Sequence, residues 1–352
     1  MTFKYWVLGF FLATSLACGK KTSPTQPVYP PPANADTTFT NPLLSSGPDP
    51  WVIQKDTMYY YMNTSGGKLA ISKTNKMSAL ASSPSVTIWT PPVTGPYSKE
   101  IWAPELHFLQ GKWYVYFAAD DGNNNNHRIY VLENAAADPT TGNWEFKGKL
   151  ADISDKWAID ASQFDYNGQS YVIWSGWPGD VNVQQNIYIA KLSNPWTITG
   201  DRVLLSSPDY AWEKIGATPT INEGPEILTN SAGKIFLTYS ASGCWTDDYA
   251  LGMLSLKTGG DPLNPADWTK SASPVFTKKP ENGAYGPGHN SFFKSRDGKE
   301  DWILYHANSS SGQGCGNARN PRMQKFTWNA DGSPNFGEAV KINVPLKKPV
   351  GQ

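Results

Sequence analysis

Three acidic residues that lie far apart in the sequence, Asp49, Asp160 and Glu223, each begin an apolar stretch of strand-like composition. If these stretches line one channel, the three carboxyl groups meet, and repulsion and burial raise the pKa of at least one of them. A protonated carboxylic acid opposite an ionised carboxylate is the pair that glycoside hydrolysis requires. A single acidic residue before a strand is more often a cap or turn residue, so the prediction of a site depends on the three positions being equivalent.

An internal repeat makes these positions equivalent. The stretch NEGPEILTNSAGKIFLTYSASG, residues 222–243, reads as a strand, a glycine-containing turn and a second strand, and four other stretches have the same form. The polar residues that open the five stretches are Asp49, Glu105, Asp160, Glu223 and His289, at intervals of 55 to 66 residues. Self-similarity at such a period, built from short strands, is typical of propeller blades.

Each repeat continues with two further strand-like stretches. The third strands are expected near Lys68, Arg128, Asn186, Tyr249 and Arg322, and the fourth strands near Val86, Trp144, Arg202, Pro274 and Val340. No segment has the apolar periodicity of a long helix. We therefore predict an all-β fold, a five-bladed β-propeller with four antiparallel strands per blade, which forms one domain over residues 41–352 around an axial channel.

Composition and charge exclude several function classes. Of 352 residues, 39% are hydrophobic, and 30 Lys and Arg residues balance 30 Asp and Glu residues. Without a basic block the chain lacks the electrostatic footprint of a nucleic-acid-binding protein, so we expect no nucleic-acid partner. His107, His127 and His306 do not have the spacing of a zinc site with any cysteine or paired histidine.

The N-terminal residues 1–18 have the features of an export signal. Lys4 precedes an apolar run from Val7 to Ala17, and small residues lead to Cys18, which resembles the lipidation site of bacterial lipoproteins. Ser15 stands where a Leu is usual, and an ordinary cleaved signal peptide is the alternative. Residues 19–40, rich in Pro and Thr, predict an extended tether. We expect an exported periplasmic or cell-surface lipoprotein whose membrane contact is a lipid on Cys18.

Two further cysteines, Cys244 and Cys315, follow the second strands of the fourth and fifth repeats. Disulfides persist in exported proteins, and equivalent positions in neighbouring blades would bring the two thiols together. Spacing alone does not fix the distance that a disulfide requires. A bridge and a pair of free thiols therefore both remain open.

Taken in order, five motifs resemble those of glycoside hydrolase family 43: DPWV from Asp49, IWAPE ending at Glu105, WAID ending at Asp160, NEGPE around Glu223, and GPGHNS around His289. The resemblance extends over the whole body from residue 41. It implies inversion of the anomeric centre in one displacement, with Asp49 as general base, Glu223 as general acid, and Asp160 tuning and orienting that acid. Inverting geometry places base and acid roughly 6.5–9.5 Å apart.

The resemblance also implies roles around the sugar. His289 matches a family histidine near the channel centre that in several members helps to hold a calcium ion mostly surrounded by water. We therefore predict His289 as a substrate or metal contact and a structural calcium in the channel; the alternative is a neutral hydrogen-bonded histidine. No cofactor is expected for the chemistry. Arg322 is expected to donate hydrogen bonds to sugar hydroxyls, with a surface ion pair as the alternative. Glu105 stands where many members have Asp and is expected to anchor the pocket wall, and Trp102 and Trp177 are candidates for stacking.

The stretches SKEIWAPELHFL, WAIDASQF and YGPGHNSFF look most like the arabinofuranosidase branch of that family. We therefore expect a glycosidase that releases terminal α-L-arabinofuranose from arabinan or arabinoxylan, with an arabinose-containing glycan as its partner. Loop shape separates this activity from those of β-xylosidases, endo-arabinanases and galactofuranosidases, which remain alternatives. A glycan-binding propeller without catalysis is a further alternative, although it has no use for an acid and base pair.

Overall fold

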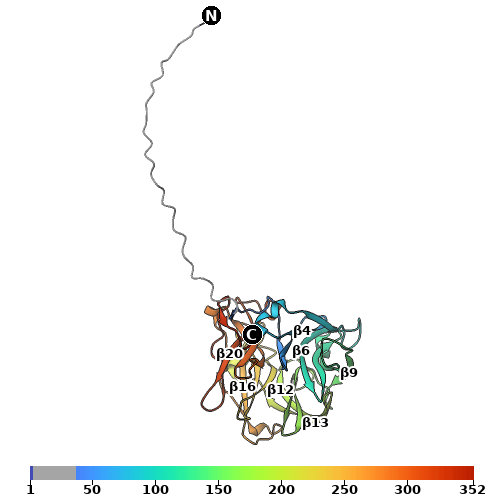
Figure 1. The fold of residues 1–352 in the computed structure, drawn as a ribbon. Coiled ribbons are helices and arrows are strands. Elements are labelled where there is room, and N and C mark those ends of the chain that lie inside the picture. Colours follow the sequence, from blue (N-terminus) through green and yellow to red (C-terminus); the bar gives the residue numbers. More distant parts are fainter. Residues whose placement is uncertain (3–36) are drawn as a thin grey trace. The chain divides into compact units, whose positions relative to one another are not determined.

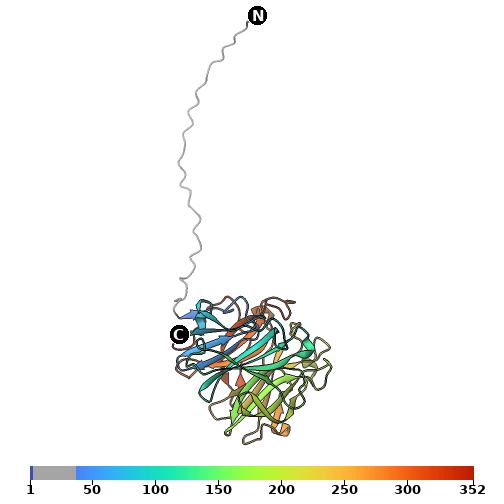
Figure 2. The ribbon, with the colours of Figure 1, turned by 90° about the vertical axis from the view of Figure 1, so that its right-hand side faces the viewer.

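The computed structural model describes residues 1–2 and 37–352, and the larger part consists of five antiparallel sheets with four strands each. In every sheet the strands follow chain order, so each sheet is one meander and one blade. The colours of the chain pass in order around the molecule, and the red fifth blade lies beside the blue first one (Figures 1 and 2). The predicted five-bladed β-propeller is confirmed.

The blades are bounded as follows: β2 Trp51–Lys55, β3 Met58–Met62, β4 Leu69–Thr74 and β5 Ser85–Trp89; β6 Lys99–Leu109, β7 Lys112–Asp120, β8 Arg128–Asn134 and β9 Glu145–Leu150; β10 Ala158–Tyr166, β11 Gln169–Gly176, β12 Asn186–Asn194 and β13 Thr197–Ser206; β14 Asn222–Thr229, β15 Ile235–Ala241, β16 Ala250–Leu256 and β17 Trp268–Lys270; β18 Tyr285–Lys294, β19 Asp301–Asn308, β20 Asn320–Trp328 and β21 Pro334–Asn335. In the described residues, helical structure is limited to short 3₁₀ turns: η1 Met77–Ser82, η2 Asn124–Asn126, η3 Ala211–Glu213, η4 Pro265–Asp267 and η5 Pro280–Asn282. None of the described helices is long and apolar enough to cross a membrane.

The first strand of each blade lies at the centre. β2, β6, β10, β14 and β18 each contact the first strand of the next blade, and β18 contacts β2, which closes the ring. Side chains at the start of these inner strands therefore face one axis although they come from five different repeats.

The core lies between blades because both faces of a middle strand are buried. Side chains alternate between the two faces of a strand. In β7, Trp113, Val115 and Phe117 pack in a cluster with the first blade, whereas Tyr114 and Tyr116 pack in a cluster with the third. This two-sided burial explains why the sequence KWYVYFAAD is nearly continuous in apolar residues.

The two ends of the described body pair with each other. β1, Thr38–Phe39, forms an antiparallel ladder with β22, Leu346–Lys347, and the Phe39 ring packs 6.1 Å from that of Trp302. The folded body therefore begins a few residues before the predicted boundary at residue 41, and the last residues of the predicted tether belong to it. The predicted signal peptide with Cys18, and the tether before residue 37, lie outside the described residues.

Two predicted outer strands are wrong. The fourth strand of the fourth blade is β17 and not the stretch near Pro274, where Phe276 forms an isolated bridge to Leu251 and fills the core. The fourth strand of the fifth blade is β21 and not the stretch near Val340, whose N–H donates to the Gln324 side chain. Apolar side chains that fill a gap between blades look like strand residues in a sequence.

Candidate active site

A β-bulge near the start of the inner strands directs side chains towards the axis. The ladder register shifts between Trp102 and Glu105, between Ile159 and Ser162, between Glu223 and Glu226, and between Gly288 and Ser291. Within each bulge one residue is left-handed: Ala103 at φ 40°, Asp160 at 57°, Gly224 at 54° and His289 at 46°, and Asp49 before β2 has φ 55°. Bulges of this kind re-aim a side chain next to a site.

The positions of the bulges show which residues of the five repeats are equivalent, and they differ in part from the alignment predicted from the sequence. Asp49, Asp160 and His289 are equivalent, as predicted, but Glu223 lies one residue before the left-handed position of its blade and Glu105 two residues after it. Glycine is needed at 224 because a Cβ there would lie 3.2 Å from the His289 ring at a φ of +54°. The fourth blade therefore presents its acid from the preceding residue.

Glu105 belongs to a second, deeper set of acidic residues. Its bulge makes it equivalent to Ser162 and Glu226, and the Ser162 hydroxyl donates to Glu226 Oε2 at 3.1 Å. Burial raises the pKa of both glutamates well above its usual value, and for Glu105 the charge of Glu226 adds to this effect. Glu105 also lies 3.0 Å from His107 Nε2. Glu105 is thus buried beside other polar side chains and is not among the residues that line the axial cavity.

The axial cavity has a volume of about 400 Å³ and brings Asp49, Asp160 and Glu223 together from three blades. His289 and Arg319 also line it. Its apolar walls include the tryptophan side chains Trp102, Trp157 and Trp245. The arrangement is a chamber with aromatic walls and three carboxyl groups.

Asp49 is held as a carboxylate. Its Oδ1 accepts a hydrogen bond from Arg319 Nη1 at 2.7 Å and lies 3.4 Å from His289 Nδ1. Burial is the largest single effect and would raise the pKa of Asp49, but the electrostatic effects of Arg319 and of the two neighbouring histidines, with a hydrogen bond from Thr64, together outweigh it and the pKa is lowered. Burial lowers the pKa of His289 and of His306, so both rings are neutral at neutral pH and Arg319 is the cation that stabilises Asp49.

Asp160 and Glu223 retain a proton more readily than ordinary acids. Burial raises the pKa of Glu223 to about 7, against the opposing effect of the Tyr249 hydroxyl, which donates to Glu223 Oε1 at 2.7 Å. Burial and the charge of Glu223 raise the pKa of Asp160, although the Gly224 N–H donates to Asp160 Oδ2 at 2.9 Å. The pair therefore holds a proton at neutral pH while Asp49 stays ionised.

Two predicted contacts lie away from the cavity. Arg322 is fully buried in β20 and donates to Asn320, to the Gly283 carbonyl and to the Asn308 carbonyl. The arginine that reaches the carboxylates is Arg319, three residues earlier. Trp177 stacks on Trp157 with ring centres 4.8 Å apart, so it supports the cavity wall from behind.

Sequence reasoning missed Arg319 and His306. Arg319 lies in the glycine-rich segment around Cys315, which has no strand pattern, and Cys315 forms a disulfide with Cys244. This disulfide lines the cavity and ties the segment to the fourth blade. His306 accepts the Asp49 backbone N–H on Nδ1 at 3.0 Å. For Arg319, the sequence offered one signal, its closeness to Cys315. For His306 we find no such signal in the sequence.

Comparison with known protein families shows to which family the chain belongs. A family model described as Glycosyl hydrolases family 43 matches residues 39–334. The chain belongs to glycoside hydrolase family 43. The predicted resemblance is thus confirmed over nearly the whole described body.

Several family 43 relatives are similar over most of the chain. An extracellular exo-alpha-(1->5)-L-arabinofuranosidase of Streptomyces avermitilis is 42% identical, covering 89% of this chain and 66% of that protein. Alpha-L-arabinofuranosidase 43 of Humicola insolens is 35% identical, covering 86% of this chain and 64% of that protein. The chain thus spans slightly less than two thirds of either relative. The crystal structure of an alpha-L-arabinofuranosidase from Lactobacillus brevis superposes with a TM-score of 0.82 at 35% identity, covering 87% of this chain and 98% of that one.

The side chains around His289 give no support to the calcium ion that the family 43 resemblance implied. Calcium takes roughly six to eight oxygen ligands. The carboxylate beside His289 Nδ1 is that of Asp49, which is already bound by Arg319, a cation. Among the described residues, His289 is in no group of three ligating side chains. His289 instead donates its backbone N–H to Ser240 and lines the cavity.

Proposed function

We propose that this chain is an inverting α-L-arabinofuranosidase that releases terminal α-L-arabinofuranose from arabinan or arabinoxylan. The observation that carries the proposal is the meeting of one ionised and two proton-retaining carboxyl groups in a single cavity. The names of the relatives, all arabinofuranosidases at 35–42% identity, support the choice of sugar. The relative from Streptomyces avermitilis and a second one from Streptomyces chartreusis, 38% identical, are both named as exo-acting, which supports release of the terminal sugar.

The chemistry assigns one step to each acid. Asp49, ionised beside Arg319, accepts a proton from a water molecule as that water attacks the anomeric carbon from the face opposite the leaving group. Glu223 donates its proton to the departing glycosidic oxygen as the bond to the anomeric carbon breaks. The products are the inverted β-anomer of arabinose and a glycan shortened by one residue. Asp160 is a positioning residue, because its Oδ2 accepts the N–H of Gly224 and so holds the backbone next to Glu223.

The preferred sugar is tested with nitrophenyl glycosides. The enzyme is expected to release nitrophenol from the α-L-arabinofuranoside at least about tenfold faster than from the β-D-xyloside, and to produce only monosaccharide from debranched arabinan. Initial-rate assays and chromatography of the products measure both. Preference for the xyloside would make the chain a β-xylosidase, oligosaccharide products would make it an endo-arabinanase, and binding without turnover would make it a glycan-binding propeller.

We also propose that the protein is exported and anchored by a lipid on Cys18, with the predicted tether between Cys18 and the folded body. The naming of the Streptomyces relatives as extracellular supports export. Cells supplied with a labelled fatty acid are expected to label the wild-type protein and not the Cys18→Ser variant. Equal labelling of the two would rule out Cys18 as the anchor, and a secreted, unlabelled wild-type protein would indicate an ordinary signal peptide.

A further inference from the structure

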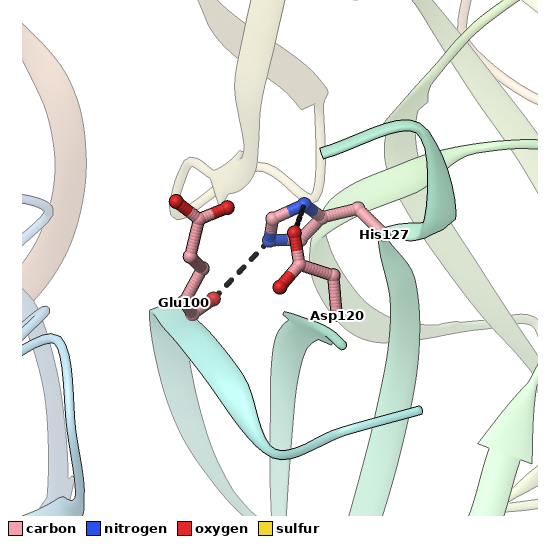
Figure 3. A group of neighbouring side chains, drawn as sticks. All are labelled: Glu100, Asp120 and His127. Atoms are coloured by element: carbon pink, nitrogen blue, oxygen red, sulfur yellow. Dashed lines mark hydrogen bonds and ion pairs between the residues drawn. The ribbon is translucent and has the colours of Figure 1, made fainter. Parts of the chain in front are cut away.

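Three ligating side chains meet in the second blade, beside the active site but outside its set of carboxylates. Glu100 lies near the start of β6, Asp120 ends β7 and His127 directly precedes β8. Figure 3 shows the three side chains gathered around the His127 ring. One ligand atom from each lies within 4.8 Å of the other two. Asp120 and His127 are fully buried, and Glu100 is exposed.

The hydrogen bond made by His127 Nε2 determines whether the other ring nitrogen, Nδ1, carries a proton. His127 Nε2 lies 3.1 Å from the Glu100 carbonyl oxygen, and a carbonyl can only accept, so Nε2 carries a proton. In a neutral ring, Nδ1 then has a free lone pair. Nδ1 lies 3.1 Å from Asp120 Oδ2, and neither atom makes a properly directed hydrogen bond within the described part of the chain. Two buried acceptors therefore face each other.

A second proton on His127 explains this contact poorly, because the approach of Nδ1 to Asp120 Oδ2 at 3.1 Å is not directed as a hydrogen bond and both buried atoms stay without a partner among the described residues. The Glu100 carboxyl group brings a third ligand atom to the same place. Glu100 is also held at a φ of 47°, which is costly for a residue of this type. A cation between these groups would relieve both the repulsion and the unpaired acceptors.

We propose that Glu100, Asp120 and His127 bind one divalent transition-metal ion, with zinc as the best match and with water in the remaining position on the exposed side of Glu100. Zinc accepts imidazole nitrogen and carboxylate oxygen at about 2.0–2.2 Å, which places neighbouring donors roughly 3 Å apart. Calcium prefers an all-oxygen set and a larger number of ligands. The bond from Nε2 to a backbone carbonyl is the usual way in which a protein orients a ligating imidazole.

The metal ion would hold one wall of the active-site cavity. Trp102, which lines the cavity, stacks on the His127 ring with centroids 4.0 Å apart and planes at 22°. Trp157, also in the lining, lies edge-on to the same ring at 6.1 Å and donates its indole N–H to the Asn124 carbonyl. Fixing His127 therefore fixes the surface against which these two indoles rest. The role is structural, because none of the three ligands lines the cavity.

Metal binding by the full exported chain tests the proposal. Protein stripped with a chelator is titrated with zinc and, separately, with calcium by calorimetry, and its melting temperature is measured with and without zinc. We expect one zinc ion per chain, a higher melting temperature with zinc by mass action, and weaker binding of calcium. Glu100→Gln is expected to weaken zinc binding by at least about tenfold. Glu145→Gln is the matched control, since Glu145 is an exposed glutamate on β9 of the same blade, and it should bind as the wild type does.

Three results would overturn the proposal. The first is the absence of zinc binding by wild-type protein, and the second is unchanged zinc affinity in Glu100→Gln. The third is calcium binding equal to or tighter than that of zinc. Because Glu100 is exposed, its replacement leaves the core intact. His127→Asn removes a second ligand and should also weaken zinc binding, and circular dichroism shows whether this variant is folded.

Discussion

Glu223→Gln is expected to lower kcat/KM on arabinan by roughly a hundredfold or more, because the amide cannot donate a proton to the departing sugar oxygen. The loss should be much smaller on the nitrophenyl arabinofuranoside, since nitrophenolate leaves without protonation. Glu223 and Gln are close in shape, and Tyr249 can still donate to the side-chain oxygen. Initial rates of the wild-type enzyme and of Glu223→Gln on both substrates measure the difference. An equal loss on the two substrates would mean that Glu223 is not the acid.

The pH dependence of kcat/KM should also reflect the protonation of Glu223. Because burial raises the pKa of Glu223 to about 7, the acid is protonated below that pH, and kcat/KM is expected to fall as the pH rises through it. Tyr249→Phe removes a hydrogen bond that favours the carboxylate, so it should move this alkaline limb upward. A limb that stays in place in Tyr249→Phe would belong to another group.

The repeat predicted the fold because each blade is a local meander with its own strand pattern and turns. It also predicted that Asp49, Asp160 and Glu223 would meet, since the first strands of all blades contact one another. The one-residue offset of Glu223 was not predictable in this way. It depends on a bulge in which Gly224 occupies the left-handed position, and a bulge changes register without a clear mark in the sequence.

Other parts of the site depend on contacts that have no sequence period. Arg322 lies in a stretch with a clear strand pattern, but its guanidinium donates to the Asn308 carbonyl within the fifth blade. Arg319 instead donates to Asp49 from a loop that the Cys244–Cys315 disulfide holds in place. Glu100 and His127 are likewise ends of different strands, brought together by the pairing of β6 with β7 and of β7 with β8. Loop paths and strand ends are set by tertiary packing, and a single sequence carries little information on either.

Asp49→Asn is expected to lower kcat/KM by roughly a hundredfold to ten-thousandfold on arabinan and on the nitrophenyl arabinofuranoside alike. Activation of water is needed whatever the leaving group, so the two losses should be similar, in contrast to those of Glu223→Gln. Asn tolerates the left-handed backbone found at residue 49 and can still accept from Arg319, so the fold should persist. Asp165→Asn, an exposed position on β10, is the control and should keep full activity.

Arg319 allows the base to be identified by pH. In the wild type its charge keeps the pKa of Asp49 below the usual range, so Asp49 should remain a base far into the acidic region. In Arg319→Gln the burial of Asp49 is offset less, its pKa rises, and the acidic limb of kcat/KM should move to higher pH. An acidic limb that did not move, together with a full loss of activity in Asp49→Asn, would show that Asp49 binds the sugar and that the water is activated by another group. The direction of that shift therefore separates a base from a binding residue, which the loss of activity alone cannot do.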